Sequence, residues 1–196
     1  MYLRKLILVA LAATLSGPLL AKGVPYDLDP MHTFPSFEAD HMGMDLWRGK
    51  LNKSSGTMLL DKSDGTGSVE LTVDLTSIDF GLDALHAWAV GPKFFDVEHF
   101  GSTATYKGKL SGFTAGGSPK VTGTLTLHGV TKPLDLKVNI FKCQPHPMTH
   151  RDWCGADAFA TFNREDFGLA EGKEWGFDMT VTLRIQVEAN IHVDQP

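Results

Sequence analysis

The chain has 196 residues, which suits one domain with a sizeable core, and 42% of them are hydrophobic. Its 23 Asp and Glu residues exceed its 18 Lys and Arg residues, giving a formal net charge of −5. The basic residues are scattered and form no stripe that could neutralise phosphates, so we expect no binding to nucleic acid and no avid binding to an anionic membrane surface.

The first 21 residues have the features of a secretory signal peptide. Arg4 and Lys5 precede the uncharged run LILVALAATL, and SGPLLA then brings helix breakers and a small residue, Ala21. This apolar run is too short for a membrane-spanning helix, which needs about 20 residues. We therefore expect a signal peptide over 1–21, a mature domain over 22–196 without an integral membrane segment, and a periplasmic or secreted protein.

Alternation of apolar and polar residues predicts β-strands along most of the mature chain. Successive side chains of a strand point to opposite faces, so each such segment has one buried and one wet face. Turn sequences such as KSDGTG separate the segments, which is typical of an antiparallel barrel or sandwich. About eight strands are expected, enough to close a barrel, over 33–42, 46–61, 68–78, 102–113, 120–129, 133–142, 156–163 and 177–189.

Residues 80–100 break this pattern. Leu82, Leu85, His86 and Ala89 have helical spacing, which Gly91 and Pro92 end. We expect a short helical insertion that either closes one end of the barrel as a plug or lid, or merely covers the bottom of the core.

The segment CQPHPMTHRDWC contains both cysteines of the chain, Cys143 and Cys154, with His146 and His150 between them. This spacing is compact enough for a tetrahedral metal site. An exported protein meets an oxidising compartment, however, and the segment joins two predicted strands whose ends should lie close together. We expect a Cys143–Cys154 disulfide and no metal ion; a metal site and free thiols remain the alternatives.

Six segments in this order resemble the YceI family, whose members are exported lipocalin-like barrels that bind polyisoprenoid and related lipids. The resemblance implies an all-β, antiparallel, lipocalin-like barrel of about eight strands with a helical insertion at 80–100, and a long apolar cavity for an isoprenoid tail. The insertion departs from the commoner pattern, with seven residues between His86 and Phe94. The segments are YDLDPMHT (26–33), FEADHMG (37–43), TSIDFG (76–81), FFDVEHFGSTATYKG (94–108), VTGTLTLHGVTKPLDL (121–136) and FNREDFGL (162–169).

The predicted ligand contacts are the inward faces of the strands and the aromatic residues of the insertion. On the strand that contains FEADH, alternation places His41 on the same face as Phe37. We expect His41 either to meet the polar head of the ligand or to be a hydrogen-bonded structural residue. The full set is Phe37, His41, Leu71, Val73, Trp88, Phe94, Phe95, Leu125, Leu127, Leu136, Val138, Val181 and Leu183.

Enzyme chemistry has little support in this sequence. It contains no G-x-S-x-G elbow, no phosphate loop and no dinucleotide fingerprint. We therefore expect a non-enzymatic protein without a cofactor, apart from a bound isoprenoid such as a quinone or polyprenyl lipid that it carries, stores or protects. The alternatives are an enzyme or metalloprotein acting on such a lipid, or a structural or stress protein with a filled barrel. These patterns leave open whether the chain forms a homodimer.

Overall fold

The computed structural model describes residues 23–113 and 117–193, so the expected signal peptide lies outside the described residues. Within these ranges the chain forms twelve β-strands, two short α-helices and three 3-10 helices. The strands are β1 Val24–Leu28, β2 Phe34–His41, β3 Asp45–Leu51, β4 Ser54–Asp61, β5 Thr66–Asp74, β6 Ile78–Asp79, β7 Thr103–Ser111, β8 Lys120–Leu127, β9 Val130–Pro133, β10 Leu136–Pro145, β11 Asp152–Asn163 and β12 Thr180–Ile191. The helices are α1 Asp83–Val90, α2 Val97–Phe100, η1 Leu75–Ser77, η3 Arg164–Phe167 and η4 Lys173–Trp175.

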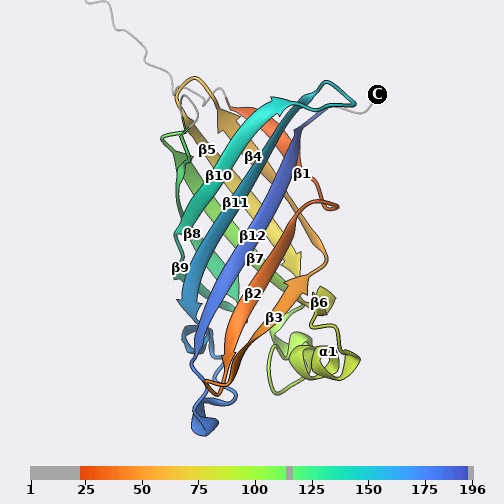
Figure 1. Cartoon of the computed structure of the whole chain (residues 1–196), viewed down its shortest axis with the longest axis vertical. Helices are drawn as coiled ribbons and strands as arrows, with labels where there is room; N and C mark the ends of the chain where they lie inside the picture. The colour runs from red at the N-terminus through yellow and green to blue at the C-terminus, as the bar shows by residue number, and fades with distance from the viewer. Residues whose placement is uncertain (1–22, 114–116, 194–196) are drawn as a thin grey trace, which may run out of the picture.

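Eight of these strands close an antiparallel barrel in the order β1-β4-β5-β7-β8-β10-β11-β12, and the pairing of β12 with β1 completes the ring (Figure 1). β12 pairs with β11 along one edge and is long enough to pair with both β1 and β2 along the other. Its C-terminal part pairs with β1, as in Ile191 opposite Tyr26, and its N-terminal part pairs with β2, as in Val181 opposite Ala39. β2 and β3 therefore extend the wall toward the end where α1 lies. The predicted all-β antiparallel barrel is confirmed.

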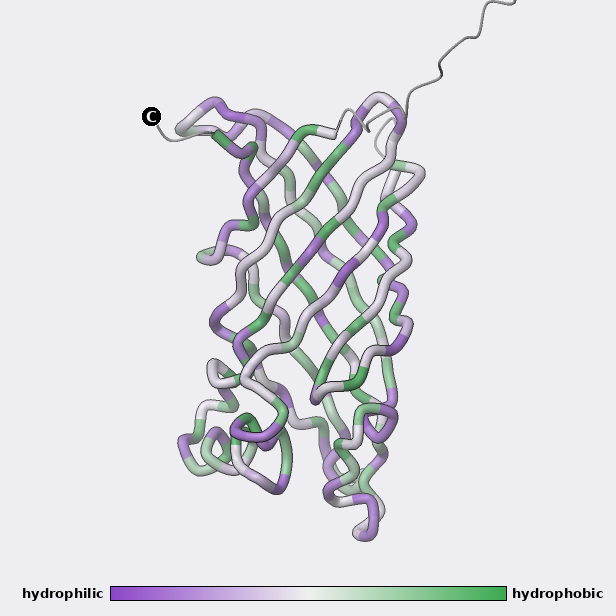
Figure 2. Tube along the Cα trace, turned by 180° about the vertical axis from the view of Figure 1, so that it is seen from behind, coloured by the Kyte–Doolittle hydropathy of each residue, from purple (hydrophilic) through white to green (hydrophobic). Residues whose placement is uncertain are grey.

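Alternation along the strands separates the inside of the barrel from its outside. In β5 and β7 the cross-strand partners Val73 and Ala104 are both buried, while the partners Glu70 and Lys107 are both exposed. Figure 2 shows the same change between apolar and polar residues along the strands. A closed ring has no free edges there and places one row of side chains from each strand inside.

Two details of the strand pattern differ from the prediction. The expected strand over 46–61 is two strands, because the chain turns at Asn52 and Lys53, whose backbone amides donate to Ser77 (3.1 and 2.9 Å). The polar run NKSSGT separates Leu51 from Met58 here, and the prediction extended one strand across it. β1 was not predicted as a strand, because its five residues are too few to display a clear alternation.

The predicted helical insertion is present. α1 spans Asp83–Val90 and ends at Gly91, whose amide donates to the carbonyl of Trp88. A second helix, α2, follows and was not predicted, since it has only four residues. Figure 1 places α1 beside β6 at the same end of the barrel as the β2–β3 turn.

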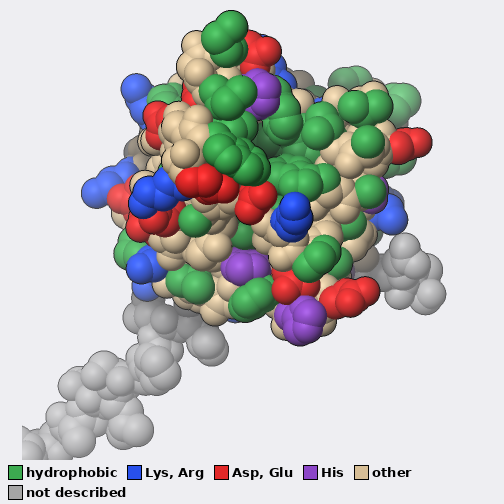
Figure 3. All heavy atoms as spheres, turned by 90° about the horizontal axis from the view of Figure 1, so that it is seen from below, with side chains coloured by type: hydrophobic (Ala, Val, Ile, Leu, Met, Phe, Trp, Pro, Cys, Tyr) green, Lys and Arg blue, Asp and Glu red, His purple; other side chains and the backbone are tan. Residues whose placement is uncertain are grey.

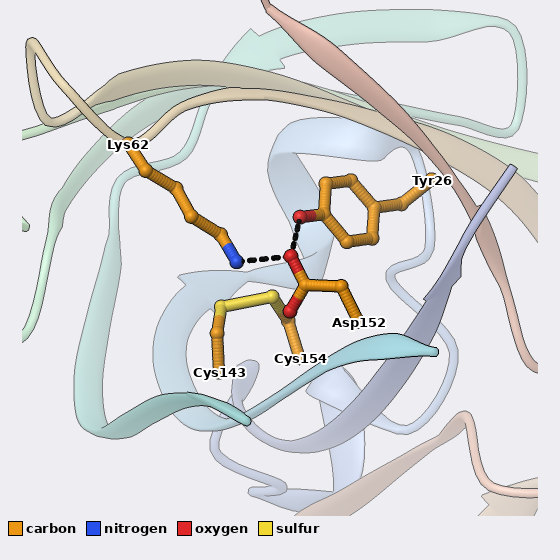
Figure 4. Close-up of a disulfide and its surroundings, with 5 residues drawn as sticks. All are labelled: Tyr26, Lys62, Cys143, Asp152 and Cys154. Atoms are coloured by element: carbon orange, nitrogen blue, oxygen red, sulfur yellow. Dashed lines mark hydrogen bonds and ion pairs between the residues drawn. A yellow bond between two sulfur atoms is a disulfide. The ribbon is translucent and has the colours of Figure 1, made fainter. Parts of the chain in front are cut away.

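A disulfide and a partly exposed polar cluster lie at the opposite end. Cys143 and Cys154 are direct cross-strand partners in β10 and β11, and the structure joins them in a disulfide. Beside it, Asp152 accepts hydrogen bonds from the Tyr26 hydroxyl (2.7 Å) and from the Lys62 ammonium (Figure 4). Tyr26 is fully buried and Cys154 nearly so. These groups close the barrel at this end.

Candidate functional site

The barrel encloses a cavity of about 640 Å³. It extends from Trp47 and Trp175, at the α1 end, to Phe141 and Cys154 near the disulfide. Its volume falls within the range of roughly 300–1,000 Å³ that is usual for small-molecule sites. The barrel is therefore hollow along much of its length, rather than packed solid with side chains.

The cavity wall is made almost entirely of apolar side chains. The alternating strands supply them from all round the ring, and Met58, Val69 and Ile185 are typical examples. Small residues keep the lumen open on the side of β11, where Ala156 and Ala158 line the cavity. A site of this kind binds a ligand chiefly by removing apolar surface from water.

The polar side chains deep in the cavity wall already have hydrogen-bond partners. The Tyr106 hydroxyl donates to the carbonyl of Leu134 (3.0 Å), and burial, with a smaller effect of the Asp135 carboxylate, raises its pKa. This ring lies close to Gly123, where an added Cβ would come within 2.4 Å of the Tyr106 hydroxyl. Glycine at that position therefore permits the tyrosine to lie flat against the wall.

Arg164 is the buried cation of the site, with only 7% of its surface exposed. Its guanidinium donates to the carbonyls of Leu169 (2.6 Å) and Glu171 (2.7 Å) and lies over the ring of Phe94, 5.5 Å from its centroid. The backbone carbonyls compensate the charge, as a buried cation requires. Arg164 thus holds the 164–171 segment against the insertion.

His41 stands near the mouth of the cavity inside a cluster of aromatic rings. Its imidazole stacks on Trp47 with a centroid distance of 4.4 Å and meets the edge of Phe177 at 5.2 Å. Its Nδ1 atom lies 3.8 Å from a carboxylate oxygen of Asp45, beyond hydrogen-bond range. This leaves the imidazole able to exchange a hydrogen bond with a ligand.

Figure 3 looks onto this end of the molecule and shows apolar side chains around a hollow, with charged side chains and histidine at its rim. The charged residues that line the mouth are Asp40, Lys93, Arg164 and Glu171. Trp88 and Phe94 from the insertion stack on each other at 4.8 Å, and Phe94 contacts Phe95 at 4.9 Å. The insertion therefore forms one side of the mouth.

Comparison with known proteins agrees with this architecture. The model of the YceI-like domain matches residues 26–191. A UPF0312 protein of Vibrio cholerae is 30% identical over 192 residues, which cover 94% of this chain and 97% of the relative. A UPF0312 protein of Pseudomonas aeruginosa is 27% identical over 155 residues, covering 79% and 80% of the two chains. The chain belongs to the YceI family.

Solved structures show the same fold as this YceI-family protein. BcnA of Burkholderia cenocepacia superposes with a TM-score of 0.68 at 21% identity, over 83% of this chain and 99% of its own. A polyisoprenoid binding domain from Saccharophagus degradans gives 0.64 at 20% identity, over 86% and 99%. At these identities the likeness establishes the shared barrel.

The structure brings the thirteen predicted ligand contacts of the YceI-family barrel together around one cavity. The ten from the strands line it from Phe37, Leu71 and Val73 on one side to Val181 and Leu183 on the other, and Trp88, Phe94 and Phe95 join them from the insertion. Their contact with a ligand stays a prediction. Arg164, which was not predicted, lines the mouth from the segment between β11 and β12, together with Trp175 and Phe177, which were not among the predicted ligand contacts.

The 143–154 segment of this YceI-family protein does not bring its cysteines and histidines together as metal ligands, because both sulfur atoms are in the disulfide. The Nδ1 atom of His146 accepts hydrogen bonds from the amides of Met148 (3.2 Å) and Thr149 (3.3 Å). His150 is exposed. The segment is a β-hairpin closed by a cross-strand disulfide.

Within 23–113 and 117–193, no helix has the length and apolar character needed to cross a bilayer.

Proposed function

We propose that this YceI-family protein binds a long apolar lipid of polyisoprenoid type inside its barrel, in the periplasm or outside the cell, for carriage, storage or protection. The continuous apolar cavity carries this proposal. The signal-peptide pattern of residues 1–21 supports export, and the polyisoprenoid binding domain with the same fold supports this class of lipid.

The cavity suits a slim chain better than a compact ligand. An eight-stranded barrel is just wide enough for one small ligand, and this one is lined from mouth to closed end by apolar side chains. Each square ångström of apolar surface removed from water contributes roughly 25 cal/mol, so a tail that lies along the cavity gains affinity with its length. The polar head remains at the mouth, where His41 lies.

The charges at the mouth favour an uncharged head over a phosphate. Two carboxylates, Asp40 and Glu171, line it together with one ammonium, Lys93. The guanidinium of Arg164 already donates to two carbonyls. A phosphate would lose its hydration beside two carboxylates, which is unfavourable. A neutral head with carbonyl or hydroxyl groups, as in a quinone, requires only a hydrogen bond such as His41 offers.

We infer that this protein acts by binding rather than by catalysis. A solved structure with the same fold is a polyisoprenoid binding domain. In the cavity, Tyr106 and Arg164 are committed to backbone carbonyls. A nucleophile beside a general base, as covalent catalysis needs, is not found among the described residues that line the cavity.

Solvent extraction of the purified protein followed by mass spectrometry tests this function. We expect close to one isoprenoid lipid per chain in the extract. An extract without lipid, from protein that also fails to take up a quinone or a polyprenol added during refolding, would contradict the proposal.

A further inference from the structure

Three potential metal ligands meet where the loop between β1 and β2 packs against β12. Asp29 and His32 belong to the loop that joins β1 to β2, and Glu188 belongs to β12. The Nδ1 atom of His32 lies 2.8 Å from Oδ2 of Asp29 and 3.9 Å from Oε2 of Glu188. Within 23–113 and 117–193, this is the one set in which three His, Cys, Asp or Glu side chains offer ligand atoms within 4.8 Å of one another.

Backbone hydrogen bonds fix the loop against β12 and so set the positions of the three side chains. The amide of Asp29 donates to the carbonyl of Glu188 (2.9 Å). The Thr33 hydroxyl donates to the same carbonyl and accepts from the amide of Glu188, both at 3.2 Å. Because Thr33 is fully buried, this connection is protected from water. These hydrogen bonds therefore hold the loop that carries Asp29 and His32 beside Glu188.

The carboxylates are also oriented by further donors. The indole Nε1 of Trp153 donates to Oε2 of Glu188 (3.0 Å), and the amide of Met31 donates to Oδ1 of Asp29 (2.9 Å). Hydrogen bonds of this kind hold the ligands of metal sites in their binding orientation. Oδ2 of Asp29 and the His32 ring remain directed at each other.

We propose that Asp29, His32 and Glu188 bind one divalent transition-metal ion, with Zn²⁺ the ion that best fits these donors. One imidazole and two carboxylates form a mixed nitrogen and oxygen set with charge −2, which suits Zn²⁺ and similar ions rather than Ca²⁺ or Mg²⁺, which take oxygen ligands. His32 is 57% exposed, so an ion reaches the cluster from solvent and water completes its coordination. This site is independent of the proposed lipid function.

The chain contains a matched control for this site. His99 also places its Nδ1 atom 2.8 Å from an aspartate three residues earlier, Asp96. That pair belongs to no three-ligand set in the described part of the chain. If a His–Asp pair alone bound the ion, both places would bind it equally.

Calorimetric titration of the mature, tag-free and metal-stripped protein with Zn²⁺ tests the proposal. We expect one ion per chain, loss of that binding in His32→Ala and in Glu188→Gln, and unchanged binding in His99→Ala. Trp153→Phe should weaken the binding by roughly tenfold, since it removes only a supporting hydrogen bond. Circular dichroism confirms that each variant is folded.

The proposal fails if the wild type binds no Zn²⁺, or if His32→Ala and Glu188→Gln bind it as the wild type does. If His99→Ala is the only variant that loses the ion, the ion binds elsewhere and the proposal is wrong as well. Co²⁺ absorption spectra give a second readout, because a change in the visible bands on Glu188→Gln reports directly on the ligand set.

Discussion

His41 is the residue whose environment most clearly combines apolar contact with an available polar group. It stacks on Trp47 and lines the mouth. We predict that His41→Ala weakens binding of a long-chain quinone by up to about tenfold, the usual effect of one lost hydrogen bond. Fluorescence titration of folded protein measures this, and His99→Ala serves as the surface control. Equal affinity of the His41 variant and the wild type would remove His41 from the site.

Asp152 makes the stability of the closed end dependent on pH. Burial alone would raise the pKa of its carboxyl, but the hydrogen bonds from Lys62 and Tyr26 outweigh burial and hold the pKa below its ordinary value. The contribution of Asp152 is thus present above the unfolded pKa, near 3.8, and is lost as pH falls through the lower folded value.

We therefore predict that the difference in free energy of unfolding between the wild type and Asp152→Asn narrows as pH falls from about 5 toward 2.5. Urea denaturation at several pH values measures it. A constant difference for Asp152→Asn over this range would contradict the assignment.

Single residues were predictable where a regular strand positions them. Alternation places Leu71 and Val73 on one face, and both line the cavity. Arg164 was missed because it lies in the irregular segment between β11 and β12. Periodicity says nothing of side-chain direction there. The Asp29, His32 and Glu188 cluster was missed because its members are far apart in sequence and meet only when β1 and β12 pair.

Among the elements, the insertion that contains α1 controls one side of the mouth. Trp88 and Phe94 stack on each other there, and Arg164 packs on Phe94. We predict that Trp88→Ala speeds the release of bound lipid to acceptor vesicles several-fold, because it opens this side of the cavity. Leu82→Ala is the control, since Leu82 lies in the same insertion but is exposed. Equal release rates in the two variants would exclude a gating role for Trp88.

The β10–β11 hairpin is the element that the disulfide stabilises. Closing a loop of this length stabilises a fold by about 3 kcal/mol in the chain-entropy model. We predict that the double variant Cys143→Ser/Cys154→Ser loses up to this amount of unfolding free energy and still binds lipid, because the mouth lies at the other end. Denaturant unfolding measures the change, and a thiol assay on unreduced, denatured wild type should find no free thiol. Two free thiols would contradict the disulfide.

Element boundaries followed from the sequence where a turn residue or a change of period marks them. The end of α1 at Gly91 is such a case. The break between β3 and β4 is not, because it lies in the polar run NKSSGT, whose composition does not fix where one strand ends and the next begins. The chain turns there because its amides bond to Ser77, a partner that only the folded structure supplies.

At the scale of the whole molecule, strand number and alternation predicted a closed barrel but did not decide whether its interior is filled or hollow. An eight-stranded ring either fills with side chains or holds a slim ligand. Which of the two occurs depends on the summed volume of the inward side chains from all strands, and these include small ones such as Ala156 and Ala158. The described barrel is hollow, and Asp40, Lys93, Arg164 and Glu171 line its mouth. That asymmetry favours a lipid whose tail lies inside and whose head lies at the mouth.

Native mass spectrometry of a cavity-blocking variant tests this account most directly. Ala158 is buried and lines the cavity, whereas Thr161 on the same strand is exposed. We predict that the wild type and Thr161→Trp each carry one isoprenoid lipid per chain, and that folded Ala158→Trp carries none, because the indole occupies the lumen. Lipid bound equally to Ala158→Trp and Thr161→Trp would contradict binding inside the barrel.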